Sequence, residues 1–546
     1  MNDLPQNWFE GIELGSMSFD ADLDERCEFS EMEAANPSIA ANSQWVWGRQ
    51  LAIAECPFSG RPLYLPSAAL LNGLIVEGRS GTRKSTGVID PLVAQLIALG
   101  IGRKILFLSF KPSQLSVTNL GIECERAGVR FRYLSTVPGA MSYGVPLLHT
   151  VKRRLPSAMD VATFLLMAMG LDFGQGYGQT YFFEVKRRVM AYIMASNQLD
   201  EQGWNFVNLA RFFAACEPPA EYTEEFEKSR TELVSLLFIL AACDAINCLP
   251  TDDRAMIDLS KFFLSPRREA LYVQVAKEQN PAISFLVPQL IMAIAAEAFS
   301  VLPDTSEIRL VVVVDEAAEF FSEYVSKMIQ RLRSKGVAFV FAYQHPGQLK
   351  QNQRDFTADF ESYASTKIYL SVEDKERAEL YRYFAGEELR VTGVSYAVEH
   401  DSDPVGGDLT PVYFLPDEYH GTKMRDGVEV IDRRASPRSV SVGPRPRLSV
   451  NDIMALFSKQ GYGVIRSSID RELWQQSGLM IPAYFPYHIS PREKDRRESV
   501  GWPASRGTKP VVFTDEFAKF VKETTRKAPT LTQGSTWARI TKNGKK

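Results

Sequence analysis

A stretch near the start of the chain, EGRSGTRKST at residues 77–86, has the residue types of a loop that binds phosphate. Gly78, Lys84 and Ser85 stand at the spacing of that motif, in which backbone N–H groups at a helix N-terminus surround the phosphate. The lysine reaches the terminal phosphates and the hydroxyl group binds Mg²⁺. The glycine that usually precedes the lysine is replaced by Arg83. We therefore predict a nucleotide-binding loop made of Gly78, Arg79, Ser80, Gly81, Thr82, Arg83, Lys84, Ser85 and Thr86.

A second motif lies much later in the chain. The sequence LVVVVDE, residues 310–316, is typical of a buried apolar strand, and it ends in Asp315 and Glu316. In ATPases with a phosphate-binding loop, the aspartate at this position binds Mg²⁺ and the glutamate after it orients the water that attacks the phosphate. Ser85 and Asp315 are thus the predicted Mg²⁺ ligands, Glu316 is a predicted catalytic residue, and ATP with Mg²⁺ are the predicted cofactors.

Short apolar runs alternate with helical patterns around both motifs. Strand-like runs are predicted at residues 70–78, 104–110, 129–135, 269–276, 307–321, 337–344 and 367–374. Alternation of such strands with helices of ten or more residues predicts a parallel β-sheet covered by helices. The fold class predicted from the pattern is therefore α/β.

The pattern changes in the middle of the chain, where apolar residues recur at helical spacing and strand signals are scarce. An all-helical domain inserted into the α/β unit explains this change. The predicted divisions are an acidic tail at 1–44, a nucleotide-binding domain at 45–150 and 266–480, the helical insert at 151–265, and a basic C-terminal extension at 481–546. Residues 405–450, rich in Gly, Pro and Arg, are predicted to form loops.

Composition narrows the class of protein. An apolar fraction of 45% and a charged fraction of 23% are those of a folded soluble protein, and a net charge of −4 requires any nucleic-acid surface to be local. Six scattered cysteines without C-x-x-C pairs argue against a zinc ribbon or disulfide framework and fit a reducing cytoplasm. The apolar segments 233–243 and 284–299 are too short or too interrupted for a membrane span, so we expect buried helices there.

Several longer stretches resemble one family. The loop and helix GRSGTRKSTGVIDPLVAQL, with Pro91 inside the helix, are similar to those of the VirD4/TraD type IV coupling proteins of conjugation, within the FtsK/HerA group of hexameric motor ATPases. REALYVQVAKEQNPAISFLVPQLIMAIAAEAF resembles the strand and helix that precede their acidic strand end. LRSKGVAFVFAYQHPGQL resembles the strand that follows it, and PRLSVNDIMALFSKQGYGVI resembles their closing segment. The resemblance covers about residues 60–480.

This resemblance implies a RecA-like P-loop ATPase domain with an inserted all-helical domain, assembled as a hexameric ring that moves DNA through a central channel. Gln344, at a strand end, is placed by it to sense the γ-phosphate or to position water. Arg333 is placed to act on the nucleotide of the neighbouring subunit, with Arg331 as a near competitor. Basic residues at 185–188 and 265–268 could line a DNA path, although solvated helix faces explain them better.

Departures from the family leave alternatives open. Relatives usually begin with transmembrane helices, and none is identified here, so we expect a cytoplasmic protein whose membrane anchor is absent or supplied by a partner at the inner membrane. Arg83 allows a second hypothesis, a nucleotide-gated adaptor with little hydrolysis. A third is a soluble HerA-like motor in DNA processing or anti-phage defence. The expected partners are single- or double-stranded DNA, other copies of the chain, and a membrane-anchor, relaxosome or defence-system protein.

Overall fold

The computed structural model describes residues 50–497 apart from 56–61, 172–178, 217–222, 276–280, 399–423, 430–434, 468–480 and shorter gaps. The predicted acidic tail at 1–44 and residues 498–546 of the predicted C-terminal extension lie outside the described residues. The chain divides into two compact units. Unit 1 comprises residues 1–92 and 364–488, and unit 2 comprises residues 93–363 and 489–546.

Unit 2 contains a parallel sheet with the strand order β8-β7-β4-β6-β5. Its strands are β4 (Lys104–Ser109), β5 (Arg130–Ser135), β6 (Glu269–Gln274), β7 (Leu310–Asp315) and β8 (Val337–Tyr343). The strands β4, β6, β7 and β8 are buried along their whole length, as expected for parallel strands covered on both faces. Associated helices are α6 (Gln114–Arg126), α14 (Pro281–Ser300), α15 (Glu323–Arg333) and α16 (Thr357–Tyr363). The predicted α/β class is confirmed.

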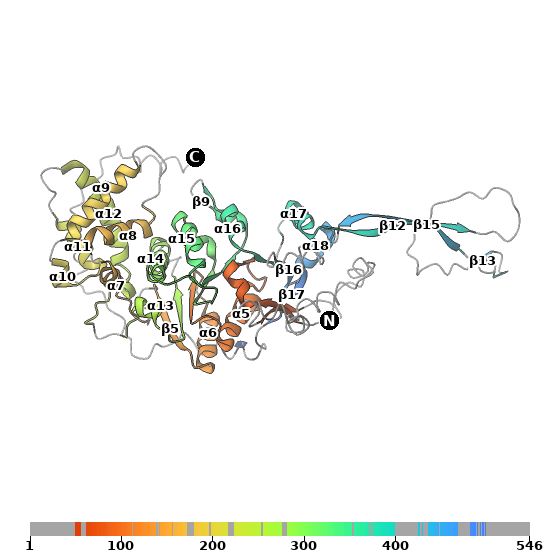
Figure 1. Ribbon diagram of the computed structural model, residues 1–546, viewed down its shortest axis with the longest axis horizontal. Helices are drawn as coiled ribbons and strands as arrows, with labels where there is room; N and C mark the ends of the chain where they lie inside the picture. Colours follow the sequence, from red (N-terminus) through yellow and green to blue (C-terminus); the bar gives the residue numbers. More distant parts are fainter. Residues whose placement is uncertain are drawn as a thin grey trace. The chain divides into compact units, whose positions relative to one another are not determined.

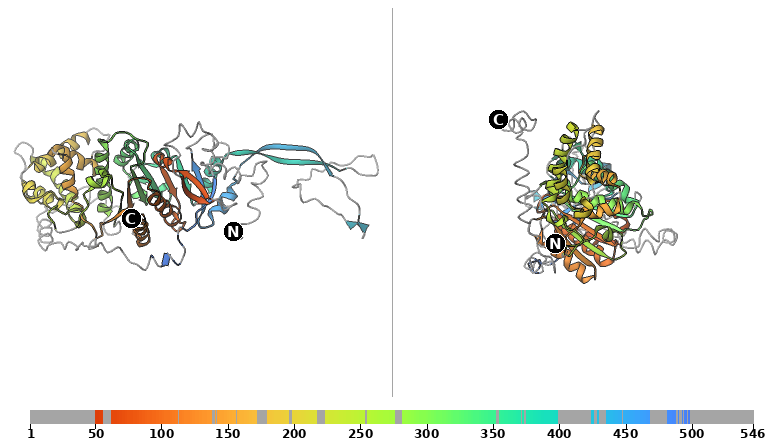
Figure 2. Two further views of the ribbon diagram at one scale, coloured as in Figure 1. Left: turned by 60° about the horizontal axis from the view of Figure 1, so that its bottom comes forward. Right: turned by 90° about the vertical axis from the view of Figure 1, so that its left-hand side faces the viewer.

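The segment between β5 and β6 is helical in its described part. Its helices are α7 (Leu147–Arg154), α8 (Ala158–Ala168), α9 (Gln179–Met194), α10 (Gln198–Gln202), α11 (Phe206–Ala215), α12 (Thr223–Ala241) and α13 (Leu259–Leu264). Figures 1 and 2 show α8, α9, α11 and α12 gathered as one helical group, and these helices pack on one another. Leu233, Leu237 and Leu240 of α12 are fully buried, which explains the apolar run that the sequence shows there.

One helix in the described part of the chain, α14, is long and apolar enough to cross a membrane by length and composition. Most of it, 78% of the apolar window, is buried inside the protein, and core helices of other proteins pass the same test. Pro288 lies inside this helix, and Gln289 is buried, with its amide Nε2 donating to the carbonyl of Phe320 at 2.7 Å. In unit 2, α14 is thus a core helix that also holds the segment after β7.

Unit 1 contains a mixed sheet with the strand order β2-β1-β17-β16-β11-β3, in which β11 and β3 are parallel. Its strands are β1 (Gln50–Glu55), β2 (Pro62–Pro66), β3 (Leu74–Glu77), β11 (Thr366–Tyr369), β16 (Tyr462–Ser467) and β17 (Ile481–Tyr484). After β3 come the predicted phosphate loop, the π-helical turn η2 (Lys84–Ile89) and the helix α5 (Asp90–Leu99). Helices α17 (Lys375–Ala385) and α18 (Val450–Phe457) pack on each other.

The prediction of loops at residues 405–450 is wrong for part of that range. β12 (Glu387–Val398) and β15 (Ala435–Pro446) pair as a long antiparallel ribbon, which extends from the region of α17 and α18 in Figure 1. A short hairpin of β13 (Met424–Arg425) and β14 (Val428–Glu429) is also present. The glycine and prolines of β15 are tolerated because a two-stranded ribbon leaves one edge of each strand unpaired.

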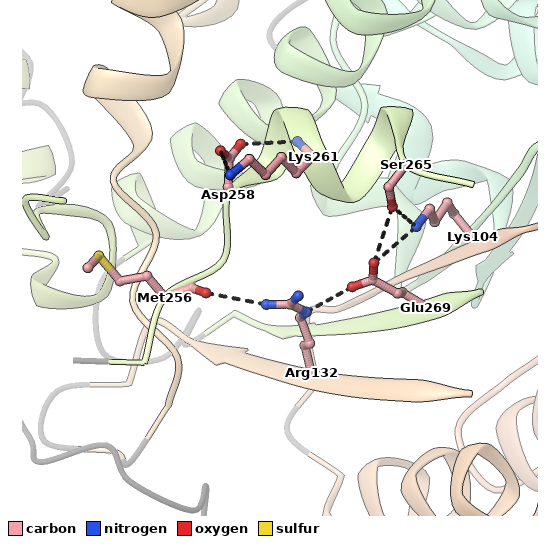
Figure 3. A network of polar contacts seen from close by, with 7 residues as sticks. All are labelled: Lys104, Arg132, Met256, Asp258, Lys261, Ser265 and Glu269. Carbon is pink, nitrogen blue, oxygen red and sulfur yellow. Dashed lines mark hydrogen bonds and ion pairs between the residues drawn. The ribbon is translucent and has the colours of Figure 1, made fainter. Parts of the chain in front are cut away.

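A buried charged network joins the helical segment to the sheet of unit 2 (Figure 3). The Glu269 carboxylate accepts from Lys104 Nζ at 3.2 Å and from Arg132 Nε at 3.0 Å. Lys104 Nζ also donates to Ser265 Oγ at 2.9 Å, and Arg132 donates to the Met256 carbonyl at 3.3 Å. Because Met256 and Ser265 lie where the helical segment returns to the sheet, the network fixes this junction.

We expect Glu269→Gln to lower the free energy of unfolding by about 3 kcal/mol or more, because it leaves two buried cations without their shared carboxylate. Burial alone would raise the pKa of Glu269, but the charges of Lys104 and Arg132 outweigh burial and hold this pKa below its usual value of 4.5. A carboxylate with a lowered pKa stabilises the fold above pH 4.5, and that stabilisation is lost as the pH falls through the folded-state value.

The measurement is the thermal midpoint of wild type and variant between pH 7 and pH 3, where we expect the gap between them to narrow on acidification. Asp304→Asn is the matched control, because Asp304 pairs with Lys335 at an exposed position and we expect little change there. A gap that stays constant with pH would contradict the assigned role of Glu269.

Candidate nucleotide-binding site

The phosphate loop in unit 1 follows β3 directly, and its two glycines are required for different reasons. A Cβ at Gly78 would lie 2.6 Å from Thr82 Oγ1 and 2.9 Å from Leu370 Cβ, so only glycine fits the space. Gly81 has open space around it but a φ of +86°, which L side chains rarely adopt. The chain can therefore turn tightly between β3 and η2.

Lys84, the predicted phosphate ligand, is buried and bends back across the loop. Its Nζ donates to the carbonyl oxygen of Gly78 at 2.7 Å. The ammonium group of Lys84 is thus held close to the first residue of the loop by its hydrogen bond to a backbone carbonyl. Ser85 and Thr86 follow in η2 and are half-buried. These are the residue types that bind the oxygens of a phosphate and of a hydrated Mg²⁺.

Arg83, which replaces the usual glycine, has φ 72° and ψ 25°, in the left-handed region. A residue with a Cβ is disfavoured there by about 1–2 kcal/mol. The backbone therefore keeps the conformation that glycine would give this position, although the side chain is large. The Arg83 guanidinium lies over the ring of Tyr487, with 4.0 Å between Cζ and the ring centroid. It also donates to the Tyr484 hydroxyl at 3.4 Å, so the side chain is held by the segment that closes unit 1.

A buried glutamate that was not predicted as part of the site lies directly before the loop. Glu77, the last residue of β3, is 1% exposed and pairs with Arg377 of α17. Its carboxylate also accepts from the Tyr381 hydroxyl at 3.1 Å. Burial, together with the charge of Glu77, raises the pKa of Tyr381 well above its usual value. The sequence shows a glutamate just before the first glycine of the loop. Its partners lie far away in the sequence, so their contact with it could not be predicted.

The predicted Mg²⁺ ligand Asp315 and the predicted catalytic residue Glu316 lie together at the end of β7. Asp315 ends β7 and is 6% exposed, and Glu316 follows with φ 59° and ψ 52°. Glu316 and Arg83 are the non-glycine residues with positive φ in the described part of the chain. The Gln344 side-chain amide donates to Glu316 Oε1 at 3.1 Å, and Gln348 Oε1 accepts from the Gln344 N–H at 3.1 Å. Gln344 therefore orients the carboxylate of Glu316.

The segment after Glu316 is held in place by α14. Ser322 Oγ donates to Gln289 Oε1 at 3.1 Å, while Gln289 donates to the carbonyl of Phe320. This double contact anchors the 3₁₀ turn η4 (Ala317–Glu319) and the start of α15. Strained backbone conformations persist where the surrounding structure holds them and they gather at functional sites, which fits the conformation of Glu316.

Arg331 and Arg333 lie in the last turn of α15, and both are exposed. Leu332 between them is buried. Burial raises the pKa of Tyr363 above its usual range, and the nearby charge of Arg333 acts in the opposite direction. Both arginines thus have the accessibility that a contact with a second molecule requires.

Three of the basic residues that could have lined a DNA path have partners within the fold. Lys186 pairs with Glu232 at 2.7 Å, and Arg187 pairs with Glu184 at 2.6 Å. Arg268 donates to the Ile97 carbonyl. The interpretation of these runs as ordinary structural features is therefore the better supported one.

The phosphate loop belongs to unit 1, whereas Asp315, Glu316, Gln344 and Arg333 belong to unit 2. Each motif has the donor set that its predicted role in binding Mg-nucleotide requires. The loop offers backbone N–H groups, a lysine and hydroxyl groups, and the strand end offers an aspartate and an oriented glutamate. The residues present therefore fit ATP and Mg²⁺.

Comparison with solved structures shows which fold this is. A structure of the bacterial conjugative coupling protein TrwBdeltaN70 matches with a TM-score of 0.51 at 11% identity, over 78% of this chain and 87% of that one. The plasmid coupling protein TrwB in complex with the GTP analogue GDPNP matches with a TM-score of 0.53 at 11% identity, over 80% and 90%. TrwB in complex with ADP and Mg²⁺ matches with a TM-score of 0.52 at 12% identity, with the same coverage. The fold is that of a RecA-like P-loop ATPase, as the resemblance predicted.

A family model also matches part of the chain. Residues 208–406 match the family described as the type IV secretion-system coupling protein DNA-binding domain. No curated protein matches the chain. The family match and the shared fold confirm the predicted resemblance to the VirD4/TraD-type coupling proteins.

Proposed function

We propose that this protein is an ATP-dependent DNA translocase of the coupling-protein type. The observation that carries the proposal is the hydrogen bond from Gln344 to Glu316 beside Asp315, because it orients a carboxylate next to a predicted Mg²⁺ ligand. TrwB structures with the ATP analogue ADPNP and with ADP and Mg²⁺ support ATP and Mg²⁺ as the cofactors.

In this proposal the predicted residues bind Mg-ATP in the following roles. Lys84 binds the β- and γ-phosphates, and Ser85 and Asp315 bind Mg²⁺. Glu316 accepts a proton from the attacking water, while Gln344 holds the carboxylate and responds to the γ-phosphate. Arg333 stabilises the charge of phosphoryl transfer on the nucleotide of a neighbouring copy, with Arg331 as the alternative. The Mg²⁺ ion, when bound, neutralises the developing charge on the phosphate oxygens.

An arginine that acts on the nucleotide of a neighbouring copy requires the copies to assemble. We infer that they form a hexameric ring. The exposed position of Arg333 in α15 supports this, and the DNA-binding description of the matched family supports DNA as the partner. The domain divisions drawn from the sequence, with the helical insert at 151–265 facing the substrate, are part of the same proposal. So are a cytoplasmic setting and recruitment to the inner membrane by a partner protein.

The adaptor hypothesis receives no specific support. The Arg83 side chain is held by Tyr484 and Tyr487, and the loop keeps the backbone conformation of a glycine at this position. A role in DNA processing or anti-phage defence would use the same chemistry in another setting.

The test is the ATPase rate of the wild-type chain with Mg²⁺, measured without DNA, with single-stranded DNA and with duplex DNA. We expect DNA to raise the rate several-fold, because a translocase couples hydrolysis to its track. Glu316→Gln, measured in the same three conditions, reports contaminating activity. Rates that are equally negligible for both proteins in all conditions would refute the proposed function.

A further inference from the structure

Two features of Arg83 are unfavourable on local grounds, namely its backbone conformation and the burial of its Nε. Its backbone is left-handed, and its Nε is buried without a hydrogen-bond acceptor among the residues that the structure describes. Such costs persist only when other contacts offset them. The contacts in question are those of its guanidinium with two tyrosines at the end of unit 1.

The segment that receives Arg83 consists of the turn before β16 and the residues at and after the end of β17. The ring of Tyr487 lies under the guanidinium, and the Tyr484 hydroxyl accepts from it. Gly461 has a φ of +86°, and a Cβ there would lie 2.8 Å from Arg83 Nη1 and 3.0 Å from the Phe485 carbonyl oxygen. The backbone of Gly461 in turn accepts from the Phe485 N–H at 2.7 Å. This closing segment is thus shaped around the arginine.

A second contact joins the same segment to the loop. Gln460 Nε2 donates to the carbonyl oxygen of Gly81 at 2.6 Å. The turn η2 also lies close to the segment, because a Cβ at Gly87 would be 3.3 Å from the Phe485 carbonyl oxygen. The phosphate loop is therefore held at Gly81, Arg83 and Gly87 by residues that follow α18.

We propose that Arg83 is a positioning residue that locks the phosphate loop to the closing segment, with Tyr487 as its aromatic platform. The inference rests on the proposed function, since it assigns Arg83 to the preorganisation of the nucleotide loop. Arginine suits this role because its planar guanidinium stacks on an aromatic ring while its N–H groups donate in the plane of the guanidinium. Glycine at this position would adopt the same backbone conformation but would lack the contacts with Tyr484 and Tyr487.

The test is a double-mutant cycle on the affinity of the full chain for a non-hydrolysable ATP analogue with Mg²⁺. We expect Tyr487→Ala to raise Kd about fivefold in the wild-type background, the size of a partly exposed cation–π contact. In the Arg83→Gly background the same substitution should change Kd less than about twofold. Tyr487→Phe should restore the wild-type affinity because the ring remains. Arg83→Lys should behave like Tyr487→Ala, because lysine lacks the planar fork.

Tyr383→Ala is the matched control, since it truncates an exposed tyrosine of the same unit and should not depend on the residue at 83. Thermal midpoints of the same variants, measured without nucleotide, verify folding and should show the same non-additivity. Saturable binding with equal effects of Tyr487→Ala in both backgrounds would overturn the role of Arg83 alone. Absence of saturable binding by the wild-type chain would overturn the proposed function and this role with it.

Discussion

Glu316→Gln is expected to lower the rate of ATP hydrolysis by about 100-fold or more while leaving the affinity for Mg-ATP within a few-fold of wild type. The amide has the shape of the carboxylate and can still accept from Gln344, so the local geometry survives. It cannot take a proton from water, and loss of a general base typically costs a factor of about 100 to 10,000. Single-turnover hydrolysis and equilibrium binding, measured on the same preparation, separate the two effects.

The matched control for this prediction is Glu319→Gln, three residues further on in the same turn η4. Because Glu319 has an ordinary place in the turn and no predicted role, we expect hydrolysis within about twofold of wild type. A parallel loss of binding in Glu316→Gln would indicate damage to the left-handed turn instead of lost catalysis. Unchanged hydrolysis would remove Glu316 from the mechanism.

Lys84→Ala is expected to weaken the binding of Mg-ATP by about 100-fold. Charge-assisted hydrogen bonds contribute about 1.5–3 kcal/mol each, and a loss of about 3 kcal/mol corresponds to roughly a 100-fold change in Kd. The lysine is buried at the mouth of the loop, where a phosphate would be screened little by water. In the wild-type chain its Nζ is already held by the carbonyl of Gly78, so little rearrangement is needed to bind the ligand.

Isothermal titration of wild type and Lys84→Ala with an ATP analogue and Mg²⁺ provides the measurement. Lys375→Ala, at the exposed start of α17 in the same unit, is the control for loss of one positive charge and should bind as wild type does. Equal affinities of the wild type and Lys84→Ala would show that the loop does not bind phosphate. Circular dichroism confirms that each variant is folded.

The elements that carry the site were predictable because their signals are local. The strands β4, β6, β7 and β8 of unit 2 appear in the sequence as apolar runs of strand length, and Asp315 and Glu316 stand where one run ends. The phosphate loop is likewise recognisable from the spacing of Gly78, Lys84 and Ser85. Such features depend on neighbouring residues and on periodicity, which a single sequence displays.

Contacts between distant segments were not predictable. Glu77 meets Arg377 and Tyr381, which lie on another helix of unit 1, and no local pattern marks them as its partners. β15 was predicted as loop because its own composition disfavours strands, and only pairing with β12 makes it one. The hydrogen bond between Glu316 and Gln344 joins two strand ends, and the sequence placed Gln344 there only through the family resemblance.

The sequence by itself thus determined the motif at residues 78–86, the acidic strand end, the α/β class and the family resemblance, because each depends on short-range order in residue types. Only the tertiary structure decided where the Arg83 side chain goes and how its backbone is tolerated. A left-handed arginine is unfavourable on local grounds, and Tyr484 and Tyr487, which offset that cost, reach it only through the folding of the closing segment.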